Sequence, residues 1–416
     1  MTKITQLLFA LLFLCTAHTV LAQTDVKVLT YNILNYPNSN NDPLDGNDAR
    51  AGYFLQIVED VNADIIIVQE LLDSTGATLL LNELNTNGTL GKTYGISGGY
   101  DIFDKYMLFY NADLFNFISV VDVPRINTAI APAGNTVLAP RGNAHYTLSY
   151  PANPTCVEQE VLLHVFDTHL KAGNDGAFNN EIADQDRRQL QALDLVDYLI
   201  ANLSTSDNII VGGDCNLYGD FEAAYQTITM NTNYPFTDPG GLWVRNDPAY
   251  LSLFTQSTRA TGVAYNNGGV WGGLDDRFDF WYYSDAITNN TDRITYSPNS
   301  YQPYGTTNVP WNAGATAGTH PLKTEIELMS DHYPLLMELQ INSPTSLCPN
   351  TCNAIENISG AIPSGFYSAT TLIDATGGIL NANSNVTLQA ANCVLLGVGF
   401  EVPVGAELTV ENIACQ

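Results

Sequence analysis

The sequence has 416 residues, and its 15 basic and 43 acidic side chains give a net charge of −28. Its length suffices for one large domain and a small one. The acidic excess repels anionic polymers at long range and counts against a protein that holds nucleic acid in a basic groove. It does not exclude an enzyme that cleaves nucleic acid, because a bound metal ion inverts the local field at its site.

The first 22 residues have the features of a cleaved secretory signal. Lys3 precedes an apolar run at 7–15, and Val20-Leu21-Ala22 supplies the small residues expected at a cleavage site. The run is too short to cross a membrane, which takes about 20 apolar residues, and no later segment is long enough. We therefore expect a secreted protein, extracellular or at the cell surface, with no stable membrane span.

Residues 23–342 alternate short apolar segments with polar loops and are expected to form the first domain. The continuous run Ile65-Ile66-Ile67-Val68 is typical of a strand covered on both faces. Helices are predicted over 47–61 and 184–203, where apolar residues recur at helical spacing. Further strands are expected at 26–31, 105–110, 161–166, 208–212, 278–283 and 335–341. This pattern fits two packed sheets with helices outside.

The composition changes at residues 343–416, which contain no Lys or Arg and are rich in Gly, Asn, Thr and Val. Apolar and polar residues alternate at 385–390 and 407–410, which predicts half-buried strands and hence a small all-β module. Four of the six cysteines that follow the signal lie in this module, which predicts disulfides formed in an oxidising compartment. In the first domain, Cys156 and Cys215 are either paired or separate thiols.

Six predicted strands begin or end in polar side chains that could hold a phosphate or a metal ion. The stretches are Tyr31-Asn32, Gln69-Glu70, Asp167-Thr168-His169, Gly213-Asp214-Cys215-Asn216, Phe278-Asp279 and Asp331-His332. Any one of them alone is better explained by a turn-forming acid or a structural histidine. Because six such stretches lie at strand ends, one shared site at a sheet edge is the stronger interpretation.

In their order along the chain, these motifs resemble those of the endonuclease/exonuclease/phosphatase family. The matching stretches are Tyr31-Asn32-Ile33-Leu34, Val68-Gln69-Glu70, Thr168-His169-Leu170, Gly212-Gly213-Asp214-Cys215-Asn216 and Ser330-Asp331-His332-Tyr333-Pro334. The resemblance covers about 25–342. It implies a four-layer α/β/β/α sandwich, with the site at one edge of the paired sheets, that hydrolyses phosphoric esters.

The resemblance implies a metal site and a general base. Glu70 is expected to be the principal metal ligand, with Asn32 and Asp331 completing the shell. Oxygen ligands without a Cys/His cluster favour Mg²⁺ or Mn²⁺ over zinc. His332 is expected to be the general base, and a hydrogen bond to Asp279 would fix its tautomer.

Other residues are implied to contact the phosphate or the attacking water. His169 and Asn216 are expected to bind the phosphate, and His169 also to protonate the leaving group or steady the charge in the transition state. Asp214 is expected to bind or orient the water, or to hold a second metal ion. The stretch Asp104-Lys105-Tyr106 resembles the deoxyribonuclease I strand whose acid supports the second histidine, although that acid is Glu there.

Two basic residues, Arg141 and Lys171, are candidates for further contact with the phosphate. A solvated surface position is the alternative for each. Three histidines match no motif and are expected to be structural: His145, His164 and His320.

The resulting hypothesis is a secreted, Mg²⁺- or Mn²⁺-dependent phosphodiesterase that acts as a monomer and hydrolyses DNA or RNA. One alternative keeps the chemistry but changes the substrate, as in a phosphomonoesterase or a sphingomyelinase-like lipid phosphodiesterase. Another is a binding or adhesion protein on the same fold without activity. The module at 343–416 resembles the C-terminal domains of Bacteroidetes-type secretion systems, so we expect it to sort or tether the protein, with a stability cap or a carbohydrate-binding unit still open.

Overall fold

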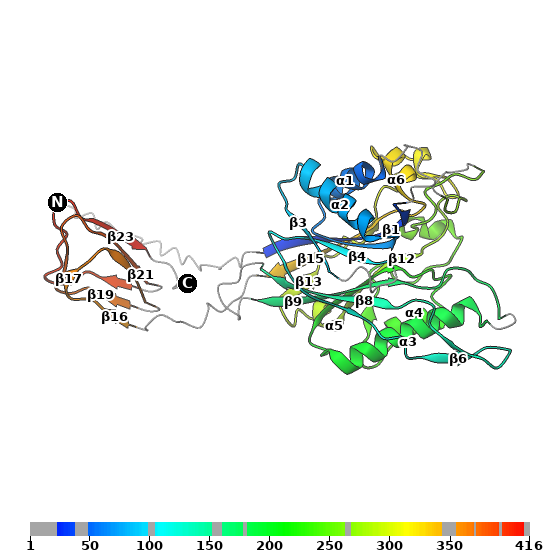
Figure 1. The fold of residues 1–416 in the computed structure, drawn as a ribbon, viewed down its shortest axis with the longest axis horizontal. Coiled ribbons are helices and arrows are strands. Elements are labelled where there is room, and N and C mark those ends of the chain that lie inside the picture. The colour runs from blue at the N-terminus through cyan, green and yellow to red at the C-terminus, as the bar shows by residue number, and fades with distance from the viewer. Residues whose placement is uncertain are drawn as a thin grey trace, which may run out of the picture.

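The computed structural model describes residues 23–37, 49–98, 105–151, 160–177, 181–262, 268–342, 355–369, 372–390 and 393–411. The larger part of the chain has four layers, with helices outside two packed sheets (Figure 1). The expected α/β/β/α sandwich is therefore confirmed. In these ranges no helix combines the length and the apolar character needed to cross a membrane. The predicted signal at 1–22 lies outside the described residues.

The first sheet is built around two parallel strands near its centre. β1 (Gln23–Tyr36) pairs parallel with β2 (Ile65–Leu71) and antiparallel with β15 (Leu335–Asn342). The order is β13-β15-β1-β2-β4-β3, and β14 also pairs with β15. The other strands are β3 (Tyr94–Ile96), β4 (Met107–Asn111), β13 (Ile294–Tyr296) and β14 (Gln302–Pro303).

The second sheet has the order β11-β12-β10-β9-β8-β5. β9 (Val161–His169) and β10 (Asn208–Asp214) run parallel, so His169 lies opposite Asp214 where both strands end. β12 (Asp279–Ser284) is antiparallel to β10. The other strands are β5 (Asn116–Asp122), β8 (Asn143–Tyr150), β11 (Phe236–Thr237) and the separate hairpin of β6 (Thr128–Ile130) and β7 (Thr136–Leu138).

Helices cover the outer face of each sheet (Figure 1). Those on the first sheet are α1 (Ala49–Val61), α2 (Ser74–Asn87) and α6 (Lys323–Met329). Those on the second are α3 (Asp184–Asn202) and α4 (Ala223–Thr229). Shorter helical turns are α5 (Asp285–Thr288), η3 (Pro248–Leu253) and η4 (Ala315–Ala317). The two predicted helices are α1 and α3.

Alternation along the strands determines which side chains lie between the sheets. In β1, Val26 and Val28 pack in the core between the sheets, whereas Leu29 and Tyr31 pack in the cluster under the helices. Because side chains two residues apart share a face, the inward series of β1 continues to Asn32. By the same rule, the inward series of β9 runs from Val165 to His169. Polar side chains at strand ends are thereby directed into the edge of the inter-sheet core.

The C-terminal module has a parallel arrangement that its alternating pattern does not predict. Successive turns of chain add strands to three stacked parallel sheets of three, two and three strands, as in a solenoid. The strands are β16 (Ile355–Asn357), β17 (Gly360–Ile362), β18 (Gly365–Ala369), β19 (Leu372–Asp374), β20 (Gly378–Leu380), β21 (Asn385–Ala390), β22 (Cys393–Leu395) and β23 (Glu407–Glu411). The expected small all-β module is thus confirmed over 355–411.

Cys215 is the cysteine whose side chain lies among the described residues. Cys215 is a free, buried thiol, so of its two alternatives the unpaired one is present. Burial raises the pKa of this thiol well above its ordinary value, which makes it unreactive at neutral pH. The predicted disulfides of the module fall on Cys348, Cys352 and Cys415, which lie outside the described residues, and on Cys393, whose side chain is not described.

Two of the histidines that match no motif form a buried cluster under α3. His145 Nε2 lies 2.9 Å from His164 Nδ1, and its Nδ1 lies 3.0 Å from the Tyr198 hydroxyl. The His145 ring also stacks on Phe166, with 4.4 Å between the ring centroids. Burial, and then the neighbouring His164, lowers the pKa of His145 from 6.5 to about 3. His145 is therefore neutral in the folded protein at physiological pH.

This cluster predicts a loss of stability in mild acid. The unfolded chain protonates His145 below its ordinary pKa of 6.5, whereas the folded chain does so only near 3. The contribution of neutral His145 to the free energy of unfolding is therefore complete above about pH 6.5. It shrinks by about 2 kcal/mol between pH 7 and pH 5. Denaturant unfolding of the wild type and of His145→Gln at both pH values checks this. The variant should lose less stability on acidification, and equal losses would contradict the assignment.

Candidate active site

Side chains from both sheets meet at the edge of the inter-sheet core where β9 and β10 end. The Asn32 amide donates to Glu70 Oε1 at 3.2 Å and to Asp214 Oδ2 at 3.0 Å. His169 Nε2 lies 3.9 Å from Glu70 Oε1 and 3.5 Å from Asp214 Oδ2. Four residues predicted from four separate strands are thus within contact of one another, two from each sheet.

A second group completes the site from β12 and the segment before β15. Asp279 Oδ2 lies 2.8 Å from His332 Nδ1, and His332 Nε2 lies 3.7 Å from Asp214 Oδ2. Thr255 Oγ1 accepts from the Asp279 amide at 3.1 Å, and Ser330 Oγ accepts from the His332 amide at 3.1 Å. Asp279 therefore fixes one ring nitrogen of His332, and the other, Nε2, lies between Gln256 Nε2 at 2.6 Å and Asp214 Oδ2 at 3.7 Å.

The electrostatic surroundings separate the two histidines. Burial, followed by Arg141, His332 and Lys105, lowers the pKa of His169 well below its ordinary value. For His332, burial acts in the same direction, but the carboxylates of Asp279 and Asp214 outweigh it and hold its pKa well above the ordinary value. His169 is therefore a neutral imidazole at neutral pH, whereas His332 carries a proton in its carboxylate surroundings.

Asp214 shares in the protonation of this group. Burial raises the pKa of Asp214 to about 7, against the opposing effect of His332. An acid whose pKa lies near neutrality can accept and release a proton at physiological pH. Because the Asp214 and His332 side chains lie 3.7 Å apart, the two groups titrate as a pair.

The backbone of Glu70 turns its carboxylate out of the strand series and toward solvent. Its φ of 61° lies in the left-handed region, which residues other than Gly, Asn and Asp rarely adopt and which can mark a functional site. The side chain is 22% exposed, against 3% for Asp214. The Asn35 amide donates to Glu70 Oε2 at 3.2 Å. Glu70 is thus held at the opening of the site.

The donor set fits a hard divalent cation, because two carboxylates, Glu70 and Asp214, lie on either side of Asn32. The Asn32 amide nitrogen faces these carboxylates, while its Oδ1 accepts from the Leu34 amide at 3.0 Å. Asn32 is therefore a donor that holds the two acids, and its role as an oxygen ligand stays a prediction. Ligand atoms of Asp214, Asp279 and His332 also lie within 4.8 Å of one another and could hold a metal ion.

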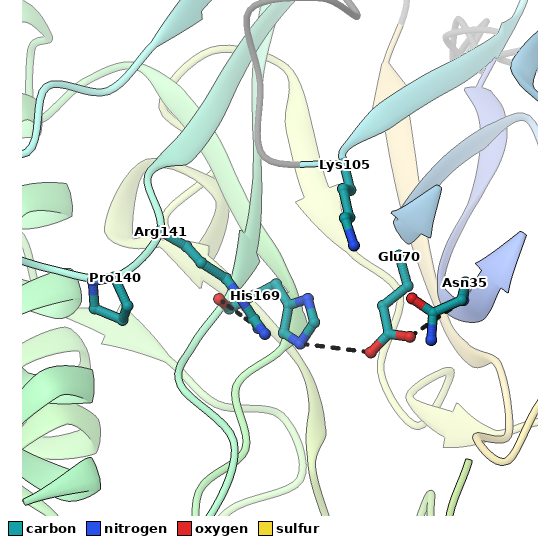
Figure 2. Close-up of a pocket in the computed structure, with 6 residues that line it drawn as sticks. All are labelled: Asn35, Glu70, Lys105, Pro140, Arg141 and His169. Carbon is teal, nitrogen blue, oxygen red and sulfur yellow. Dashed lines mark hydrogen bonds and ion pairs between the residues drawn. The ribbon is translucent and has the colours of Figure 1, made fainter. Parts of the chain in front are cut away.

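A cavity of about 460 Å³ opens over Glu70 and His169 (Figure 2). Lys105 points toward Glu70 from one wall, and Arg141 lies beside His169 on the other. Arg141 donates to the Leu170 carbonyl at 3.2 Å, which holds it against the end of β9. Two cations therefore face the space where a phosphate would meet Glu70 and His169.

Three other predicted residues are not among those that line the cavity. Asn216 lies beside Asp214, whose Oδ1 accepts from its amide at 3.0 Å. Asp331 accepts hydrogen bonds from the Val270 amide at 2.8 Å and from the Gln256 side chain at 3.4 Å. It therefore faces these two loop residues, whereas Glu70 contacts a separate set, namely Asn32, Asn35 and His169. Lys171 pairs with Asp184 at 3.1 Å and is not among the residues that line the cavity. Asp104 lies outside the described residues.

Besides Asn35, which contacts Glu70, three residues near the site were not predicted as site residues. Lys105 lines the cavity, and the Tyr106 hydroxyl accepts from the His169 amide at 3.0 Å. Gln256 Nε2 lies 2.6 Å from His332 Nε2. The Asp104-Lys105-Tyr106 stretch contained a signal for the first two. Gln256 has none, because it lies in a loop with no strand-end motif.

Comparison with known proteins identifies the family. The endonuclease/exonuclease/phosphatase family model matches residues 29–332. A family protein from Bacteroides vulgatus is 18% identical, with a TM-score of 0.45 over 77% of this chain and 100% of that chain. The human nocturnin catalytic domain is 15% identical (TM-score 0.43; 77% and 97% covered), and a mannosyl-6-phosphatase from Bacteroides thetaiotaomicron is 15% identical (TM-score 0.42; 76% and 99% covered). A comparison with curated proteins finds no match. Because the family match spans well over half of the chain, from β1 to His332, this protein belongs to the endonuclease/exonuclease/phosphatase family.

Proposed function

We propose that this protein is a divalent-metal-dependent phosphodiesterase that cleaves nucleic acid outside the cell. Members of its family are phosphoester hydrolases. The observation that carries the proposal is the contact between Glu70 and Asn32 from one sheet and His169 and Asp214 from the other, beneath a cavity that carries two cations. A protein that only binds or adheres has no need of such a buried, charged arrangement.

Glu70 would be the principal ligand of Mg²⁺ or Mn²⁺, and Asp214 would orient the attacking water. When bound, such an ion neutralises charge on the phosphate and makes water a better nucleophile at neutral pH. Lys105 and Arg141 would bind the non-bridging phosphate oxygens that enter the cavity. His169, kept neutral by burial, can donate one hydrogen bond to the phosphate from its Nε2.

The proton of the attacking water would pass to the pair of Asp214 and His332. Asp279 holds His332 Nδ1 at 2.8 Å, which keeps Nε2 directed toward Asp214 at 3.7 Å. A pair whose members lie this close can take up a proton at one atom while the charge is shared by both. This preorganised pair would supply the acid–base part of the reaction.

A second candidate is a hydrolase for small phosphoesters, such as a phosphomonoesterase. A long nucleic acid is held by many Lys and Arg contacts to its phosphates, whereas the cavity is lined by two cations, Lys105 and Arg141. Elsewhere in the described chain, Arg188, Arg245 and Arg277 are paired with carboxylates. Because these arginines are paired and the net charge is −28, few cations among the described residues remain to bind a chain of phosphates. A small substrate with one phosphate group is therefore favoured over a long nucleic acid.

The extracellular setting rests on the signal-like residues 1–22, and the solenoid module would sort or tether the protein. Mass spectrometry of the protein released by the native host checks this proposal. A mature N-terminus near Gln23 is expected, and a cytoplasmic protein that retains residues 1–22 would contradict it.

A substrate panel tests the function. With Mg²⁺ or Mn²⁺ present, we expect plasmid nicking or RNA hydrolysis that EDTA abolishes and added metal restores. His332→Ala, purified in parallel, controls for a contaminating nuclease. Turnover of p-nitrophenyl phosphate alone would support the second candidate, and release of phosphorylcholine from sphingomyelin alone would indicate a lipid substrate. Activity that persists in EDTA would contradict metal dependence. Absence of turnover on every substrate would favour a binding protein.

A further inference from the structure

A buried polar layer lies between the two sheets, one step below the site. It consists of Thr30 on β1, Gln69 on β2 and Asp167 on β9, each 0% exposed. Gln69 Nε2 donates to Asp167 Oδ1 at 2.6 Å and to Thr30 Oγ1 at 3.1 Å. Gln69 therefore links the first sheet to the second inside the core.

Each member of this layer lies on the same strand as a residue of the site. Thr30 precedes Asn32 by two residues, and Asp167 precedes His169 by two, so each pair shares the inward face of its strand. Gln69 directly precedes Glu70, whose left-handed φ of 61° turns its carboxylate into the cavity. The position of these three buried residues therefore determines the positions of Asn32, Glu70 and His169 at the strand ends.

The site depends on the distance between the sheets at this depth. Glu70 and His169 belong to different sheets and are 3.9 Å apart, and Asn32 and Asp214 also belong to different sheets and are 3.0 Å apart. Apolar contacts in the surrounding core are not directional and do not fix such a separation. A hydrogen bond fixes both distance and angle, and the bond from Gln69 to Asp167 spans the same gap.

Stability alone does not account for an acid at this position. Asp167 Oδ2 has no hydrogen-bond partner among the described residues, and a buried polar atom without a partner costs stability. Burial raises the pKa of Asp167 well above its ordinary value, against the effect of Gln69, so the carboxyl is neutral at physiological pH. An apolar side chain of the same size would avoid the cost of burying this group.

We propose that Asp167 is a positioning residue that, through Gln69, sets the distance across the sheets between Glu70 and His169. The inference rests on the proposed metal-dependent function, since Glu70 is the residue it positions for the metal ion. It predicts that the acceptor atom Oδ1 matters and the charge does not. An amide at this position should therefore serve, and an aliphatic side chain should not.

Asp167→Leu and Asp167→Asn test this in the full-length protein. For the Leu variant we expect kcat to fall about tenfold or more, and Mn²⁺ affinity measured by electron paramagnetic resonance to weaken by about tenfold. Its KM should stay within about twofold of the wild type, because the phosphate contacts of Lys105 and Arg141 are unchanged. The Asn variant should keep kcat and Mn²⁺ affinity within about threefold of the wild type.

Leu163→Ala is the matched control, because Leu163 lies on the same face of β9 but six residues from His169. It should lower the melting temperature and leave kcat and Mn²⁺ affinity at wild-type values. Wild-type kcat and Mn²⁺ affinity in Asp167→Leu would overturn the inference, as would an Asn variant as impaired as the Leu variant. If Asp167→Leu does not fold, Asp167→Ala is judged by the same two readouts. If the wild type binds Mn²⁺ but has no turnover, the proposed function fails, and the Mn²⁺ affinities of the variants still decide the inference.

Discussion

His332→Ala is expected to lower kcat by about a thousandfold, within the range that general acid–base catalysis contributes. The imidazole links Asp279, at 2.8 Å, to Asp214, at 3.7 Å. Without it, Asp279 becomes a fully buried carboxyl with no imidazole partner, and Asp214 loses the cation with which it shares a proton. Initial rates on whichever substrate the panel identifies measure the effect, and circular dichroism checks that the fold is intact.

Asp279→Asn is the informative companion to this variant. The amide can still contact His332, but it cannot stabilise an imidazolium as a carboxylate does. We therefore expect a smaller loss than in His332→Ala and a double variant no worse than His332→Ala, because the two residues act as one unit. Independent, multiplying losses would contradict the pairing, and wild-type turnover in His332→Ala would refute the role of His332.

Glu70→Gln is expected to lower kcat/KM at least about a thousandfold when the metal ion is at ordinary concentration, because metal catalysis supplies several kcal/mol. The substitution keeps the size of the side chain but removes the charge that faces Asn32 and His169. Mn²⁺ binding, followed by electron paramagnetic resonance, should weaken in parallel. High Mn²⁺ concentrations should restore part of the activity, because the remaining donors are still in place.

Glu338→Gln is the matched control for this substitution. Glu338 lies on β15 in the same sheet and is partly buried, but it lies away from the cavity. It should leave turnover, Mn²⁺ affinity and the melting temperature at wild-type values. If Glu70→Gln bound Mn²⁺ as tightly as the wild type, Glu70 would not be a metal ligand.

Much of the fold and of the site followed from the sequence, because both depend on local periodicity. The period of two along a strand determines which side chains face inward. Once Val26 and Val28 are assigned to the core between the sheets, Asn32 must follow on the same face. For the same reason the strand-end motifs could be expected to share one edge, and the Asp279–His332 contact, implied by the resemblance to the family, is present at 2.8 Å.

Only the tertiary structure decided which partner each charged side chain has. Lys171 and Lys105 both lie near site motifs in the sequence, yet Lys171 pairs with Asp184 while Lys105 faces the cavity. The reason is that such contacts join segments that are separate in the sequence, and the periodicity within a strand or helix does not indicate which separate segments will meet. The same holds for Gln256, which reaches His332 from a loop 76 residues away.

The C-terminal module shows the same division. The alternation at 385–390 and 407–410 predicted two strands, which are present as β21 and β23, but β21 is largely buried whereas Val410 of β23 is 48% exposed. It did not determine their parallel pairing, because alternation looks the same in parallel and antiparallel sheets. Pairing direction depends on the path of the chain between strands, here a solenoid turn. The sequence thus determined where these strands lie, and the tertiary structure decided how they pair and which of their faces are buried.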